Sequence, residues 1–161
     1  MANASSDWIT AFRGTLQTAV DADATFGTAG IGLKVKLVGD GDAGLKESII
    51  LIRPEADGVQ VDTEHAAVGA KRRTEEVTFP SRLQVKAAGK ASETSGTFEE
   101  AMDRAQALLD IVIEELRDNP PSAGDQSFQP LIESHAFDPL VIDQGWGVIC
   151  DFDITVRIRV S

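Results

Sequence analysis

The sequence predicts an α+β fold, in which a mostly antiparallel sheet carries two main helices packed on one face and one long loop is exposed. Three observations predict it. Two segments, 5–20 and 97–116, place apolar residues at helical spacing. Three others, 31–37, 77–87 and 146–160, alternate apolar and polar residues as half-buried strands do. The strands also follow one another at hairpin-like spacing, which favours antiparallel pairing.

The N-terminal helix is predicted to begin near Ser5 and Ser6, either of which can cap it, with Asp7 adding a favourable negative charge to the first turn. Its apolar residues then fall on one face at helical spacing. They are Trp8, Phe12, Leu16 and Ala19 or Val20. The helix is expected to end before the glycine-rich stretch that starts near Gly27.

Two strands are predicted next, at 31–37 and 48–53. The first alternates apolar residues with glycine and lysine, and the second holds a continuous apolar run that Pro54 ends. The segment 39–44 between them is rich in glycine and aspartate and reads as a turn. We therefore expect these two strands to form a hairpin.

The segment 55–76 lacks periodicity and is mostly polar, so it is predicted to be an exposed loop, with a short pairing open to Val59 and Val61. The loop is long for a compact domain, and loops of this length are often used for contacts. It carries the only concentrated positive charge in the chain, and that charge fits either a solvated loop or a docking contact for an acidic partner. The residues concerned are Lys71, Arg72 and Arg73, with His65 nearby.

The second half of the chain begins with the strand at 77–87, in which Pro80 predicts an edge position or a bulge. Thr97 and Glu100 form a capping box that opens the second helix. Its apolar stripe consists of Phe98, Met102, Ala105, Leu109, Val112 and Leu116. Two short strands are expected at 128–133 and 140–142, with His135 near a turn between them.

The last strand, 146–160, is predicted to be a principal core element. Seven apolar side chains occupy every second position, and burying them contributes roughly 10 to 20 kcal/mol before the opposing chain entropy. They are Val148, Cys150, Phe152, Ile154, Val156, Ile158 and Val160. The opposite face carries mainly polar residues: Asp151, Asp153, Thr155, Arg157 and Arg159.

Length and composition limit the classes of function. A chain of 161 residues fits one domain, 1–161, and its formal net charge of -11 disfavours sequence-specific nucleic-acid binding. One cysteine excludes an internal disulfide and does not support a zinc site. Residues 1–20 lack the apolar stretch of a signal peptide and no run approaches the ~18 to 20 residues that span a bilayer. We expect a soluble protein, made in the cytoplasm, that does not contact a membrane.

A search for chemistry finds no catalytic constellation. Asp151 and Asp153 point the same way and can in principle share a proton, but Arg157 and Arg159 lie on that face too, so charge pairing across a neighbouring strand or subunit is favoured. The segment 39–44 lacks the ending of a phosphate loop and the acids of a calcium loop. Neither histidine has a metal-binding spacing, and Cys150 reads as a small buried hydrophobe. We expect no enzyme activity, no metal and no cofactor.

The order of these elements resembles the tail terminator, or tail completion, proteins of long-tailed bacteriophages. The likeness covers nearly the whole chain, and the ending Cys150-Asp-Phe-Asp-Ile-Thr-Val-Arg-Ile carries it most clearly. Other parts that match are the helix with Trp8 and Leu16, the extended pair at 33–52, the start Arg73-Thr-Glu-Glu-Val, and the helix at 98–116. The chain departs from smaller members in the acidic region after Pro54.

The resemblance implies a structural virion protein, assembled in the host cytoplasm, that forms a hexameric ring at the head-proximal end of the tail tube. The ring would end tube polymerisation and offer a surface to the head completion, or stopper, protein, while genome DNA passes through its lumen without specific binding. Another tail or neck component of related fold, such as a tube subunit or head-tail connector, is the alternative, followed by a small binding module. The candidate subunit or partner interface comprises His65, Lys71, Arg72, Arg73, Asp151, Asp153, Arg157 and Arg159.

Overall fold

The computed structural model of the chain describes residues 4–38, 47–52, 60–65, 73–88, 94–118, 126–127, 131–142 and 145–160. Two helices and seven strands occupy these residues. In chain order they are α1 (Ala4–Asp21), β1 (Lys34–Val38), β2 (Ser48–Ile52), β3 (Gln60–His65), β4 (Arg73–Ala88), α2 (Thr94–Asp118), β5 (Gln126–Ser127), β6 (Leu131–Ile142) and β7 (Gly145–Val160).

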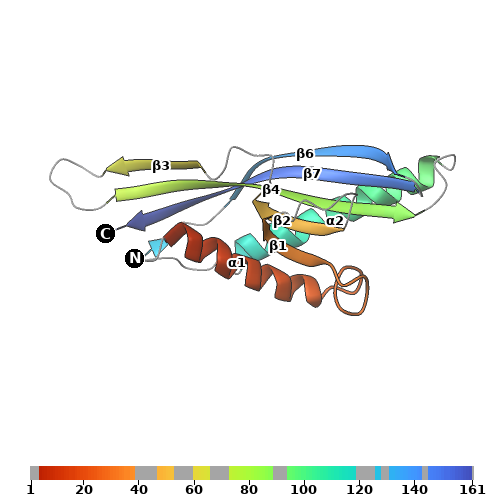
Figure 1. Cartoon of the computed structure of the whole chain (residues 1–161), viewed down its shortest axis with the longest axis horizontal. Helices are drawn as coiled ribbons and strands as arrows, with labels where there is room; N and C mark the ends of the chain where they lie inside the picture. The colour runs from red at the N-terminus through yellow and green to blue at the C-terminus, as the bar shows by residue number, and fades with distance from the viewer. Residues whose placement is uncertain are drawn as a thin grey trace.

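The strands of the described residues form one sheet, in which β4 and β7 are the central pair. These two strands are 16 residues long each, and they pair antiparallel along their whole length. The strand order is β1-β2-β4-β7-β5, with β3 also pairing with β4 and β6 also pairing with β7. Both helices lie on the same side of the sheet (Figure 1). The α+β fold with its helices on one face, predicted from the sequence, is therefore confirmed.

The core lies between the helices and the inner face of the sheet, which we define as the face toward α1 and α2. The stripe on α1 is fully buried, and Trp8 stacks on both Phe12 and Phe79 with ring centroids 5.3 and 5.9 Å apart. On α2, Ala105, Leu109, Val112 and Leu116 are buried as predicted, while Phe98 and Met102 are only partly buried. The strands contribute Val148, Cys150, Phe152, Ile154 and Val156 from β7.

The hairpin expected between the first two strands is wrong. β1 and β2 pair in parallel, with Lys34 opposite Ser48 and Val38 opposite Ile52. The segment 39–44, predicted to be a turn or short loop, lies outside the described residues, and a parallel pair in general needs a connection that returns to the start of the first strand. The apolar alternation is the same for either direction of pairing, so it does not reveal which one forms.

The segment 22–33 forms a compact turn between α1 and β1, where the first strand had been predicted to start at residue 31. The Asp23 carboxylate accepts hydrogen bonds from the N–H groups of Thr25 and Phe26, at 2.8 and 3.0 Å. Leu33 N–H donates to the Phe26 carbonyl at 2.8 Å, which closes the segment. A side chain at Gly27 would place its Cβ only 2.3 Å from the Asp21 carbonyl oxygen, so glycine is required there.

The predicted exposed loop at 55–76 is partly wrong. Residues 60–65 are strand β3, and β4 begins at Arg73, so the two strands pair antiparallel with His65 opposite Arg73. Polar residues in both strands hide the period-two pattern that marks a half-buried strand. We call β3, residues 73–78 of β4 and residues 155–160 of β7 the strand extension. Figure 1 shows it at one end of the sheet, away from α2.

Two further predictions about the strands need correction. The register of β4 places Pro80 in a central strand, but between the stretch paired with β3, which ends at Thr78, and the stretch paired with β2, which begins at Arg82. On that side of β4, Pro80 therefore has no partner in β2 or β3 that would need its missing N–H, and the position is locally an edge. The turn expected near His135 is absent from β6, which runs continuously from 131 to 142.

Both helices begin earlier than predicted. α1 starts at Ala4, so Ser5 and Ser6 lie inside it, and α2 starts at Thr94, so the capping box at Thr97 lies within the helix. Within the described part of the chain, neither helix has the length and apolar character needed to cross a membrane.

Candidate assembly surfaces

The predicted polar face of β7 lies on the outer face of the sheet, opposite the helices. Asp151 is directly opposite Arg82 of β4, and its carboxylate accepts a hydrogen bond from Arg82 Nε at 2.7 Å. The Arg82 and Asp151 side chains are 17% and 36% exposed, so this ion pair is partly shielded from water. Asp153 is half-buried and faces Pro80 in the register. Asp151 is thus bound to an arginine on the neighbouring strand rather than arranged as one of a carboxylate pair.

A second ion pair lies further along the same two strands. Arg157 Nε donates to the Glu76 carboxylate at 3.0 Å, directly across from it in the register. Between the two ion pairs, the hydroxyls of Thr78 and Thr155 approach to 3.4 Å. Cross-strand pairs of this kind stabilise a sheet and fix its register. The Arg157 side chain is 63% exposed, which leaves it accessible to a neighbour.

The register brings several of the predicted interface residues to the strand extension. His65 lies opposite Arg73, Arg73 lies opposite Val160, and Thr74 lies opposite Arg159. The backbone positions of His65, Arg73 and Arg159 therefore meet at the end of the sheet. Lys71 and Arg72 lie outside the described residues.

The edges of the sheet differ in a way that sequence reasoning missed. At β1, the Val35 N–H donates to Gln17 Oε1 at 2.8 Å, and Gln17 Nε2 donates to the Leu33 carbonyl at 3.1 Å. The side chain from α1 thus bonds to the beginning of this edge in the place of a neighbouring strand. At β6, the only strand partner among the described residues is β7.

An apolar groove lies beside β6, and the sequence analysis did not predict it. Its volume is about 270 Å³. Leu131 and Val141 of β6 are 50% and 58% exposed, and Ile113 of α2 is 37% exposed. The groove is lined by Ile113, Leu116, Arg117, Leu131, Ile132 and His135. The sequence signal was the apolar residues at both ends of 131–142, which had been read as two separate short strands.

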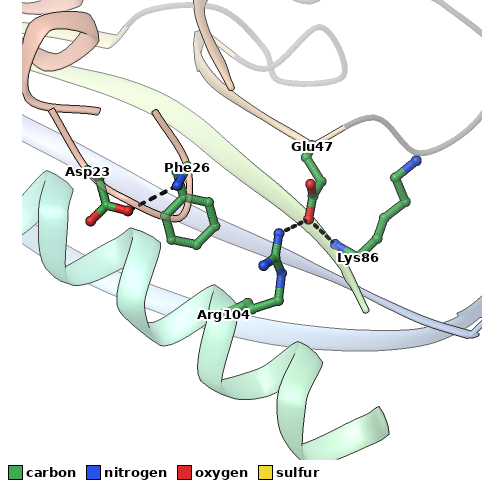
Figure 2. Close-up of polar contacts among 5 residues, drawn as sticks. All are labelled: Asp23, Phe26, Glu47, Lys86 and Arg104. Carbon is green, nitrogen blue, oxygen red and sulfur yellow. Dashed lines mark hydrogen bonds and ion pairs between the residues drawn. The ribbon is translucent and has the colours of Figure 1, made fainter. Parts of the chain in front are cut away.

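A shielded polar cluster joins the turn segment, Glu47 just before β2, strand β4 and helix α2 (Figure 2). The Arg104 guanidinium donates to the Glu47 carboxylate at 2.6 Å, and the same carboxylate oxygen accepts the Lys86 N–H at 2.9 Å. The guanidinium carbon lies 5.2 Å from the centre of the Phe26 ring, within range of a cation–π contact. The cluster connects α2 to β4 and to the start of β2. Arg104 and Glu47 are distant in sequence, so no local pattern predicts their contact.

The chemistry of the described residues is limited. No three of their His, Cys, Asp and Glu side chains are grouped so as to hold a metal ion. Burial raises the pKa of the Cys150 thiol to about 11, so this thiol stays protonated and is a poor nucleophile at neutral pH. His135 is exposed and packs edge-on against Phe137, with ring centroids 5.5 Å apart.

No family model matches the chain, and no curated protein sequence matches it.

Proposed function

We propose that the chain is a structural virion protein that forms a ring at the head-proximal end of a phage tail tube. In this role it ends tube polymerisation and joins the tail to the head or neck through a head completion protein. The proposal starts from the resemblance of the sequence to tail terminator proteins, which implies an α+β subunit.

The observation that carries the proposal is the strand extension. β4 and β7 stay paired for all 16 residues, and β3 adds a third strand at the end that lies away from α2. Val77 and Val156 of the extension are buried in the core, so the part available to a neighbouring subunit is the outer face that carries Arg157. Arg157 lies on the extension with its side chain 63% exposed, and the backbone positions of Arg73 and Arg159 are close to it.

The charge of the chain supports the same role. A formal net charge of -11 would make the lumen of a ring repel DNA, so that DNA slides through without being held. The exposed face of α2 contributes many of these acids: Glu99, Glu100, Asp103, Asp110, Glu114 and Asp118.

Electron microscopy of the purified protein mixed with tail tubes tests the proposal. We expect ring-shaped particles bound to one end of each tube, and light scattering should give the copy number of free rings. Because a ring can form on the tube alone, a monomeric free protein is compatible with the proposal if tube ends are capped. A protein that polymerises into long tubes by itself would instead be a tube subunit, and one that never binds tube ends would refute the proposal.

A further inference from the structure

Four strands of the described residues, β1, β3, β5 and β6, have a single strand partner, and β6 is the longest of them at 12 residues. Gln17 bonds to the beginning of the β1 edge, whereas β6 pairs with β7 on one side and with no described strand on the other. An unpaired edge presents a row of N–H and C=O groups that favours pairing with another strand. In Figure 1, β6 is the outermost strand on its side of the sheet.

We infer that β6 pairs antiparallel with β6 of a second copy of this chain. The aliphatic residues larger than alanine lie at the two ends of β6, Leu131 and Ile132 at one and Leu140 to Ile142 at the other, and Phe137 lies near its middle. In an antiparallel pair of identical strands, the start of one strand lies opposite the end of the other. The pattern of this strand is therefore complementary to itself, because apolar ends meet apolar ends.

The register of this pair is the one that matches the two apolar ends of β6, and the pairing with β7 provides the count of positions along the strand. Leu131 and Ile142 lie opposite Thr155 and Gly145 of β7, and Phe137 lies opposite Cys150, midway between them. A two-fold axis at Phe137 places Leu131 opposite Ile142 of the second copy, and Ile132 opposite Val141. The bulge between Ile132 and Ser134 is included in this count.

The groove beside β6 offers a site for the exposed side chain of Val141 from the second copy. Ile132 lies opposite Ile154 of β7, and Val141 lies opposite Trp146. Ile154 and Trp146 are an even number of residues apart, so their side chains are on the same face of β7, the face toward the helices. Ile132 and Val141 therefore face the helices too. The groove between β6 and α2 is also lined by Ile132. When Val141 of the second copy lies opposite Ile132, the Val141 side chain enters the groove. The two-fold symmetry gives two such contacts in each dimer.

The size of the contact fits a modest dimer. A 12-residue strand extends about 40 Å at ~3.3 Å per residue. The lower end for specific interfaces, about 1,200 Å² in total, requires a strip about 15 Å wide along this length on each copy, which is wider than the strand alone and includes the groove beside it. Pro139 has no N–H, so each copy lacks at most one hydrogen bond in this ladder. Because a two-fold contact does not close a ring, the inference is independent of the proposed ring contact.

Sedimentation or light scattering of the purified full chain, over concentrations up to about 1 mM, measures this dimer. The Val141→Glu and Leu131→Glu variants should each weaken dimerisation by at least about 100-fold, because every dimer carries the buried charge twice. Ile31→Glu is the matched control, since Ile31 is 46% exposed but lies in the turn segment. A wild-type monomer over the whole range, or a dimer that survives both β6 variants, overturns the inference.

Cross-linking tests the register. The Leu131→Cys/Ile142→Cys variant should form a covalent dimer on mild oxidation, whereas each single-cysteine variant should not, because each residue is far from its own copy across the axis. Cys150 is fully buried and does not interfere. Single variants that cross-link as well as the double variant would contradict this register.

Discussion

Removing the Arg104 guanidinium should destabilise the protein more than any other loss of a single charge described above. Arg104 and Glu47 form the most shielded ion pair of the described residues whose contacts are given, with side chains 20% and 14% exposed. The Arg104→Met variant keeps the length of the stem but leaves the Glu47 carboxylate with only the Lys86 N–H as a described donor.

The expected cost follows from this shielding. Removing one partner of a fully buried ion pair costs about 3 to 5 kcal/mol, because the remaining charge loses both water and its counterion. Partial access of water reduces this cost, and loss of the contact with Phe26 adds back about 0.5 to 1 kcal/mol. We expect Arg104→Met to lower the free energy of unfolding by about 2 to 4 kcal/mol.

Urea unfolding followed by circular dichroism measures the free energy of unfolding. The slope of this free energy against urea concentration should be the same in the variant and in wild type, which checks that both expose the same surface when they unfold. Adding Glu47→Gln to Arg104→Met should recover at least about 1 kcal/mol, since the neutral amide still accepts the Lys86 N–H. Arg117→Met is the control, because the Arg117–Asp118 pair is 60% and 56% exposed, and it should leave stability unchanged. An Arg104→Met variant within about 0.5 kcal/mol of wild type would refute the reasoning.

Three further predictions follow from the described contacts. Gly14→Ala should stabilise α1 by about 0.5 to 1 kcal/mol, because nothing lies within 4 Å of the added Cβ, whereas Gly27→Ala should destabilise by several times as much; urea unfolding of both variants decides this. The raised pKa of Cys150 means that the thiol stays protonated in the folded state at pH values where it ionises in the unfolded chain. The stability that this difference contributes is complete below pH 9 and is lost as the pH rises toward 11. Over this range the free energy of unfolding should fall less steeply for Cys150→Ala than for wild type. Reversing Arg157 to glutamate should cost less than about 1 kcal/mol in the monomer but weaken ring assembly on tubes; assembly equal to wild type would remove this face from the interface. Adding Glu76→Arg restores the intrachain ion pair, so assembly that stays weak in the double variant identifies Arg157 itself as a contact.

The parts of the fold that sequence predicts best are those with a strong local period. The buried face of β7 and the stripes of α1 and α2 were read directly, because one apolar residue recurs at each turn or at every second position. The predicted direction of the β1–β2 pair was wrong because the alternation of apolar and polar residues is the same in parallel and antiparallel pairs. β3 was predicted only as a possible short pairing at Val59 and Val61, because Val61 is the one strongly apolar residue of 60–65 and the segment otherwise reads as a loop.

The candidate surfaces could be predicted only in part. Asp151 and Arg157 lie on one predicted strand face, so their pairing with the neighbouring strand was expected, although their partners Arg82 and Glu76 come from the register and not from the sequence. The contact of Arg104 with Glu47 joins residues 57 apart, and the bond of Gln17 to the beginning of the β1 edge joins residues 18 apart. Such contacts depend on tertiary packing, which no local pattern encodes.

The length of tail tubes tests the central claim most directly. Tube subunits are allowed to polymerise with and without this protein present at far less than one copy per subunit, and electron microscopy measures the lengths. A ring that caps growing ends should give shorter tubes, with a ring visible at one end, and the effect should depend on the number of rings added. Tubes of unchanged length and bare ends would contradict the account.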